Sequence, residues 1–197
     1  MGKRVVILAS GSGSNAQALL DSDDLGGDVV AVVADVPGAG VLARADTAQV
    51  EAVCIDRAAY PDRPTWEAAL TEAVAERQPD LVVLAGFMRI LSGAFVSRWP
   101  ILNVHPSLLP SFPGGSAVAD ALAHGVKVTG VTVHFVVEEV DAGPIVAQEA
   151  VALEPGDTAD TLHERLKAVE HRLLPHAVAL FCTDRLTVDG RFVRIQQ

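Results

Sequence analysis

Apolar residues come in short continuous runs through the first half of the chain. The runs are rich in Val, Ile and Leu and are bounded by Gly, Asp, Pro or Asn; they cover Val5–Ala9, Val29–Ala34, Leu81–Ala85 and Ile101–Val104. Runs of this length and composition are typical of strands buried on both faces of a parallel sheet. The pattern therefore predicts a sheet whose two faces are both covered.

Helical patterns lie between these runs. The clearest, Pro64–Gln78, has a proline in its first turn and places Trp66, Leu70 and Val74 at four-residue spacing. Three further candidates are Ser14–Asp21, Gly40–Gln49 and Ala117–Ala123. Strands that alternate with helices predict a doubly wound α/β fold.

The second half of the chain has a different pattern. Val128–Val137 alternates along much of its length and predicts a longer strand, and Ile145–Val151 predicts another after a turn. The capping pair Asp157-Thr158 begins a predicted helix over Ala159–Phe181. Two short strands around Asp189-Gly190 predict a terminal hairpin, because this dipeptide favours the tight turn that hairpins require.

Composition narrows the class of protein. The 197 residues are 50% hydrophobic and 20% charged, and no linker or repeat divides them, so we expect one domain over residues 1–197. The net charge of −10 argues against a nucleic-acid partner, since nucleic acids bind basic surfaces. Any anionic ligand must therefore be held by local amides or a few local cations.

Two further features bear on location. No apolar run approaches the roughly 18 residues of a membrane helix, and no signal peptide is recognisable at the start of the chain. Cys54 and Cys182 are too few for a disulfide framework and have no CxxC spacing for zinc. We therefore predict a cytoplasmic protein with no membrane partner and no metal.

A glycine-rich segment, Gly11-Ser12-Gly13-Ser14-Asn15, separates the first strand from the first helix. Glycines allow close approach to a ligand, and free N–H groups at a helix start favour phosphate. The same segment matches a dinucleotide fingerprint, with Asp35 near the place of a ribose-binding acid. On this segment alone, a phosphate site, a dinucleotide site and a plain strand-to-helix turn all stay open.

Asn103 and His105 provide further evidence on which of these three interpretations applies. They are two residues apart at the end of a predicted strand, so their side chains share one face. Ligands of open α/β sheets gather at the carboxyl ends of strands. An amide and an imidazole at such an end can donate hydrogen bonds to a developing oxyanion. An isolated pair of this kind is more often structural, so the surrounding residues decide.

Those surroundings are the run NVHPSLLP, from Asn103 to Pro110, and the later Asp141-Ala142-Gly143-Pro144. They resemble the signature of the folate-dependent formyltransferases. Further matches lie at Gly11–Asn15, Ala85–Leu91, Val131–Phe135 and Glu170-His171. The resemblance implies formyl transfer from 10-formyltetrahydrofolate to the amine of a phosphoribosyl glycinamide. It also implies a mostly parallel seven-stranded sheet with a Rossmann-like N-terminal half.

The resemblance implies roles for individual residues as well. The catalytic trio corresponds to Asn103, His105 and Asp141. The ribonucleotide site corresponds to Gly13, Ser14, Asn15, Asn103 and Glu170. The folate site corresponds to Arg63, Met88, Arg89, Ile90, Leu91, Asn103, Val137, Glu138, Glu139, Val140 and Asp141. The implied partners are these small-molecule substrates; no metal is implied, and a homodimer is left open.

Three positions depart from the family pattern. Ser116 stands where a histidine is common, Ala119 where an arginine is frequent, and Ser111 where a basic residue is often found. The loop after Pro110 is therefore less positive than the family pattern. Two other activities stay open: a nicotinamide-dependent oxidoreductase, suggested by the glycine-rich segment and Asp35, and a formyltransferase acting on a sugar nucleotide.

Overall fold

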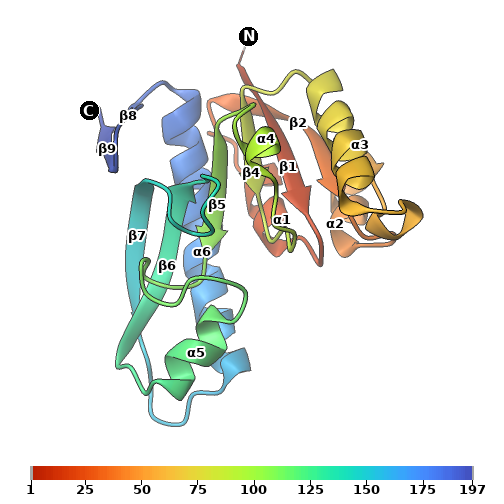
Figure 1. Ribbon diagram of the computed structural model, residues 1–197. Helices are drawn as coiled ribbons and strands as arrows, with labels where there is room; N and C mark the ends of the chain where they lie inside the picture. The colour runs from red at the N-terminus through yellow and green to blue at the C-terminus, as the bar shows by residue number, and fades with distance from the viewer. Residues whose placement is uncertain (1, 197) are drawn as a thin grey trace.

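The computed structural model describes residues 2–196 and shows a seven-stranded sheet in the order β3-β2-β1-β4-β5-β6-β7 (Figure 1). The strands are β1 (Lys3–Ala9), β2 (Gly27–Ala34), β3 (Glu51–Cys54), β4 (Leu81–Leu84), β5 (Ile101–His105), β6 (Val128–Phe135) and β7 (Ile145–Ala152). Strands β1 to β5 are parallel, whereas β6 is antiparallel to β5 and to β7. This mostly parallel sheet confirms the predicted fold class.

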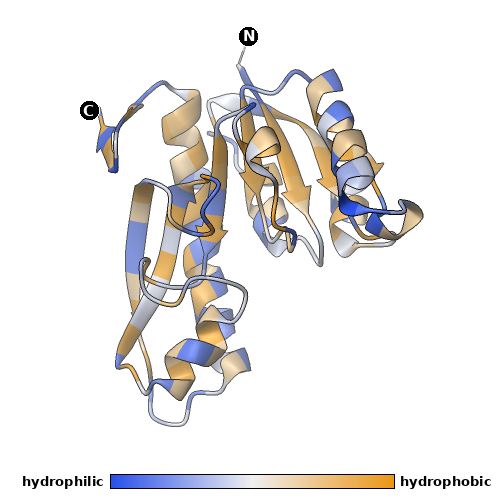
Figure 2. Ribbon diagram, in the orientation of Figure 1, coloured by the Kyte–Doolittle hydropathy of each residue, from blue (hydrophilic) through white to orange (hydrophobic). Residues whose placement is uncertain are grey.

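Helices cover both faces of the sheet. They are α1 (Ser14–Leu20), α2 (Gly40–Thr47), α3 (Arg63–Glu76), α4 (Gly93–Val96), α5 (Ala117–Ala123) and α6 (Ala159–Cys182). Side chains of β1 alternate between two cores: Val5 and Ile7 pack with α1, α2 and α6, whereas Val6 and Leu8 pack with α3 and α4. Figure 2 shows the resulting hydrophobic strands in the middle of the fold. Within residues 2–196, no helix is long and apolar enough to cross a membrane.

The hydropathy pattern misses three short elements and extends one strand too far. β3 is an edge strand of four partly buried or exposed residues, so it has no continuous apolar run. A 3-10 turn, η1 (Arg57–Ala59), and the single-turn helix α4 are too short for a periodic signal. The strand expected over Val128–Val137 ends at Phe135, because the chain then turns into the loop that carries Asp141.

The terminal hairpin has the predicted form. β8 (Leu186–Asp189) and β9 (Phe192–Ile195) pair antiparallel in a two-stranded sheet of their own (Figure 1). Gly190 has a φ of 59° in the turn between them. A side chain rarely adopts this left-handed conformation, so the turn explains the Asp-Gly pair.

The strand order places the site. β1 lies between β2 and β4, so the chain leaves β1 toward one side of the sheet and later continues from β4 toward the other. The loops that follow β1 and β4 flank this switch point, where open α/β sheets bind ligands. Ser10 joins the two loops: its N–H donates to the Gly86 carbonyl at 3.1 Å, and its Oγ accepts from the Met88 N–H at 2.8 Å.

Candidate active site

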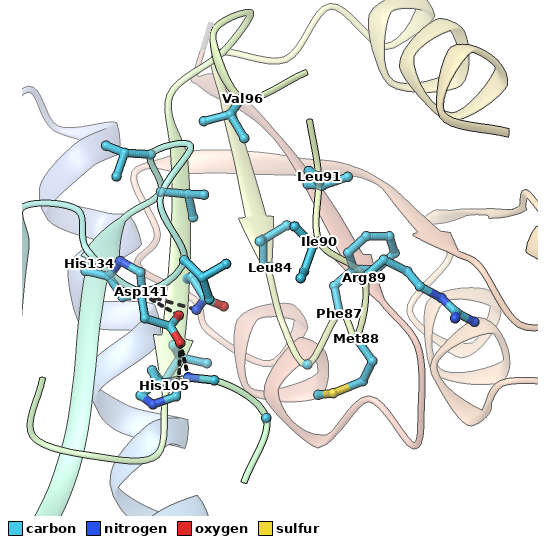
Figure 3. Close-up of a pocket in the computed structure, with 18 of the residues that line it drawn as sticks. Leu84, Phe87, Met88, Arg89, Ile90, Leu91, Val96, His105, His134 and Asp141 are labelled. Atoms are coloured by element: carbon cyan, nitrogen blue, oxygen red, sulfur yellow. Dashed lines mark hydrogen bonds and ion pairs between the residues drawn. The ribbon is translucent and has the colours of Figure 1, made fainter. Parts of the chain in front are cut away.

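A pocket of about 270 Å³ opens at the carboxyl ends of β4 and β5 (Figure 3). Its walls come from the segment after β4, the end of β5 and the loop after β6. Its lining includes Asn103, His105 and Asp141, together with Met88, Arg89, Ile90, Leu91, Val137, Glu138 and Val140. The structure therefore brings most of the residues expected for catalysis and for folate around one cavity.

His105 is fixed by the loop that follows its own strand. The residue is 5% exposed, and its Nε2–H donates to the carbonyl of Phe112 at 2.8 Å. That bond leaves Nδ1 as the nitrogen that faces Asp141, whose Oδ2 lies 3.5 Å away. Figure 3 shows the Asp141 carboxylate between His105 and His134. Asp141 can therefore stabilise a proton on Nδ1 without holding that nitrogen in a tight hydrogen bond.

One buried hydroxyl, that of Thr132 on β6, holds the NVHPSLLP run against the sheet. Thr132 is fully buried; its Oγ1 donates to the Ser107 carbonyl at 2.7 Å and accepts from the Leu109 N–H at 3.1 Å. Gln148 of β7 adds a bond to the Leu109 carbonyl at 2.9 Å. These bonds hold the start of the loop that brings the Phe112 carbonyl back to His105.

Asn103 is oriented by His134 of β6. His134 is 1% exposed and pairs with Asn103 in the β5–β6 register. Its Nδ1–H donates to the Phe135 carbonyl at 2.9 Å, so in the neutral ring Nε2 accepts from Asn103 Nδ2 at 3.2 Å. The second hydrogen of the Asn103 amide remains available to a ligand in the pocket.

Asp141 sits in a left-handed backbone conformation, with a φ of 54°. Aspartate is among the few residues that tolerate this region. Burial alone would raise the pKa of its carboxyl, but three neighbours together hold that pKa below its ordinary value: His134, whose Nε2 lies 3.6 Å from Oδ1, the Gly114 N–H, which donates to Oδ2 at 2.7 Å, and the His105 ring. Asp141 is therefore ionised at neutral pH and supplies a negative charge beside both histidines.

The glycine-rich segment forms a second part of the site. Gly13 has a φ of 78° and caps α1, and a Cβ added to it would lie 2.6 Å from the Cβ of Val41. Only glycine fits this close approach of two segments. Two residues later, Asn15 Nδ2 donates to Oε2 of Glu170 at 2.8 Å, so α1 and α6 bring these predicted partners together. Glu170 is 4% exposed, and Asn15 Oδ1 is buried without a partner within residues 2–196.

Three residues expected in the folate site lie outside the pocket or point away from its catalytic residues. Arg63 lies outside the pocket, at the start of α3, and reaches it only through a 2.8 Å bond from its guanidinium to the Ile90 carbonyl. Glu139 is exposed and does not line the cavity. Arg89 lines the pocket, but Figure 3 shows its guanidinium directed away from Asp141 and His105. No group of three or more His, Cys, Asp or Glu within residues 2–196 could hold a metal ion.

Comparison with known proteins agrees with this geometry. A family model described as formyl transferase matches residues 3–178. The chain belongs to this family. It is 50% identical to a phosphoribosylglycinamide formyltransferase of Mycobacterium tuberculosis, over 95% of this chain and 89% of that protein. It is also 46% identical to the human trifunctional purine biosynthetic protein adenosine-3, over 98% of this chain and 20% of that protein.

Solved structures of relatives share the whole fold. Glycinamide ribonucleotide transformylase 1 from Symbiobacterium toebii superposes with a TM-score of 0.95 at 48% identity, covering 100% of this chain and 95% of that one. A phosphoribosylglycinamide formyltransferase from Coxiella burnetii superposes with a TM-score of 0.92 at 36% identity, covering 99% and 94%. The resemblance inferred from NVHPSLLP and the later aspartate motif is therefore confirmed at the level of family and fold.

Proposed function

We propose that the chain transfers the formyl group of 10-formyltetrahydrofolate to the amine of N1-(5-phospho-D-ribosyl)glycinamide, a step of de novo purine biosynthesis. The observation that carries the proposal is the gathering of Asn103, His105 and Asp141 at one pocket of a formyl transferase. The relatives named above support the choice of acceptor, since their names specify phosphoribosylglycinamide or glycinamide ribonucleotide.

The residues suit direct transfer. The substrate amine attacks the formyl carbon, a C–N bond forms, and the carbonyl electron pair moves onto oxygen to give a tetrahedral oxyanion. Asn103 Nδ2–H and a protonated His105 Nδ1 can donate to that oxyanion, and the Asp141 carboxylate stabilises the imidazolium. The oxyanion then collapses, the bond to N10 of the folate breaks, and N10 takes a proton. Asp141, directly or through water, accepts the proton lost by the amine.

The two parts of the site suit the two substrates. We place the phosphate of the ribonucleotide at Gly13, Ser14 and Asn15, and its glycinamide end near Glu170, which is held by Asn15. The folate lies in the pocket against Met88–Leu91 and the loop from Val137 to Asp141. Arg63 and Glu139 are assigned to the outer end of the folate, because both lie outside the cavity.

The oxidoreductase alternative requires Asp35 to be free for a ribose. Asp35 is instead fully buried at its side chain, and its Oδ2 lies 2.5 Å from Arg89 Nε. A carboxylate already paired and shielded from solvent does not offer its oxygens to a ribose hydroxyl. A sugar-nucleotide acceptor would differ from the proposed acceptor only in the group that the glycine-rich segment binds. The experiment therefore includes such an acceptor as a competing substrate.

We expect formyl transfer to glycinamide ribonucleotide, followed as 10-formyltetrahydrofolate consumption and as mass of the formylated product. Parallel reactions contain a sugar nucleotide amine as acceptor, and titrations contain NAD or NADP without folate. Transfer to the ribonucleotide with no saturable dinucleotide binding below the millimolar range supports the proposal. Faster transfer to the sugar nucleotide, or micromolar dinucleotide binding that Asp35→Ala abolishes, would contradict it.

Location and assembly stay predictions. Both proposed substrates are charged anions, which cross an apolar bilayer at great cost. The enzyme must therefore work in the compartment where they are made, which we take to be the cytoplasm. A homodimer also stays a prediction, to be checked by light scattering.

Ser116→His is expected to be tolerated. Ser116 precedes α5, is exposed and makes no side-chain cap bond, so its replacement removes no contact of the fold. An imidazole there can add one hydrogen bond toward the ribonucleotide, and a neutral hydrogen bond is worth about 0.5–1.5 kcal/mol. We therefore expect up to a roughly tenfold change in KM for the ribonucleotide and little change in kcat. Steady-state kinetics at saturating folate, with Ser116→Ala as the matched control, measure this; a hundredfold rise in kcat would make the loop catalytic.

A further inference from the structure

Asp35 is a buried carboxylate that the proposed chemistry does not use. It directly follows β2, and its side chain is fully shielded from solvent. Oδ1 is buried without a hydrogen-bond partner within residues 2–196, and Oδ2 accepts a hydrogen bond from Arg89 Nε at 2.5 Å. Burying a carboxylate with so few partners is costly, so its single strong contact needs a reason.

The contact partner, Arg89, belongs to a wall of the folate pocket. Arg89 lies in the middle of the segment Gly86–Leu91, which lines the cavity from the β4 side. Two side chains of this segment pack little against the protein: Met88 is 72% exposed and Ile90 is 62% exposed. Burial therefore does little to fix the segment at these two residues. Polar contacts must therefore fix its course across the opening.

Three such contacts hold the segment from three different elements. Ser10, after β1, bonds to Gly86 and to the Met88 N–H. Arg63, at the start of α3, donates to the Ile90 carbonyl at 2.8 Å. Between these two points, the segment is anchored by the bond from Arg89 Nε to Asp35, directly after β2. Both side chains of this bond carry charge, and hydrogen bonds to ionised groups are about twice as strong as neutral ones.

We infer that Asp35 is a positioning residue for the folate site: it holds the Arg89 side chain and thereby fixes the backbone of Met88–Leu91 against the bound folate. The inference rests on the proposed function, since it names which wall of the site is set by a residue outside the pocket. The buried carboxylate also neutralises the guanidinium of Arg89. Arg89 therefore contributes to the pocket through its backbone and stem rather than as a free cation.

The test compares Asp35→Ala and Asp35→Asn in steady-state kinetics with each substrate varied in turn. Losing a charged hydrogen bond at the anchor should raise KM for 10-formyltetrahydrofolate about tenfold in Asp35→Ala. Asp35→Asn keeps an acceptor oxygen for Arg89 Nε and should show an intermediate value. In both variants kcat and KM for the ribonucleotide should stay within about twofold, because neither Asn103 nor Glu170 touches the anchor.

Asp157→Ala provides the matched control. Asp157 pairs with Arg165 at 2.6 Å and is 5% exposed at its side chain, but it lies just before α6 and does not line the pocket. This variant should lose stability to urea and keep the folate KM of the wild type. The Asp35→Ala variant can fold, because Arg89 is 43% exposed at its side chain and can turn to solvent; Asp35→Asn tests the inference independently.

Two further measurements distinguish a positioning role of Asp35 from a general loss of protein stability. Hydrogen–deuterium exchange of residues 86–91 should quicken in Asp35→Ala and stay unchanged in Asp157→Ala. Arg89→Ala and the double variant Asp35→Ala/Arg89→Ala should have the same folate KM, since the second substitution then removes no further contact.

Three outcomes would each contradict the inference. They are an unchanged folate KM in Asp35→Ala, equal rises in both KM values with a fall in kcat, and additive effects of the two substitutions. A wild-type protein without formyl transfer would contradict the proposed function, whereas the exchange experiment would still decide how Asp35 acts on the segment.

Discussion

Replacing His105 by alanine is expected to lower kcat by about two to three orders of magnitude, the scale seen when one oxyanion donor is lost. His105 Nδ1 lies 3.5 Å from Asp141 at the pocket, whereas the guanidinium of Arg89, which also lines the pocket, is directed away from both residues. KM for both substrates should change little, because the imidazole is assigned to the transition state rather than to ground-state binding.

The fold should survive this substitution. His105 makes one side-chain hydrogen bond, to the Phe112 carbonyl, and leaving that acceptor unpaired costs about 1–3 kcal/mol of stability. Urea unfolding of each variant checks this before kinetics are compared. His163→Ala is the matched control, since His163 is exposed on α6 and does not line the pocket. Turnover like that of the wild type in folded His105→Ala would remove His105 from the mechanism.

The sheet was predictable because burial on two faces leaves a strong mark on a sequence. Val5–Ala9 and Leu81–Leu84 are uninterrupted apolar runs, and both prove to be central strands. β3 shows the limit of this argument. It sits at the edge, buries little of its side chains, and is a strand because β2 offers it hydrogen bonds, which is information from another part of the chain.

The site was predictable only in part. The two-residue spacing of Asn103 and His105 on one strand places them together, as the structure shows. Asp141 lies 36 residues beyond His105, and only the resemblance brought it into the trio. The contact of His134 with Asn103 comes from the register of β5 and β6, and a polar residue within a strand carries no local signal of such a partner. Asp35 was noticed for a dinucleotide pattern, whereas its contact with Arg89 spans 54 residues.

Asp141→Asn is expected to lower kcat by about two to three orders of magnitude, although the shape of the side chain is kept. The amide can still accept from the Gly114 N–H, so the loop should hold its course. It carries no charge, however, and so leaves nothing anionic beside His105 Nδ1 to stabilise the imidazolium or to take up the amine proton. Asp46→Asn, on the exposed side of α2, is the matched control.

Stability against pH gives this prediction a second, independent measurement. The folded-state pKa of Asp141 lies below its ordinary value of 3.8, so its ionised form contributes stability above that value and loses the contribution as the pH falls through the folded-state pKa. Asp141→Asn cannot titrate. The difference in unfolding free energy between wild type and variant should therefore shrink as the pH falls below about 4. A difference that grew as the pH fell below about 4 would mean that the folded-state pKa of the carboxyl is raised rather than lowered, and Asp141 could then be neither the partner of the imidazolium nor the acceptor of the amine proton.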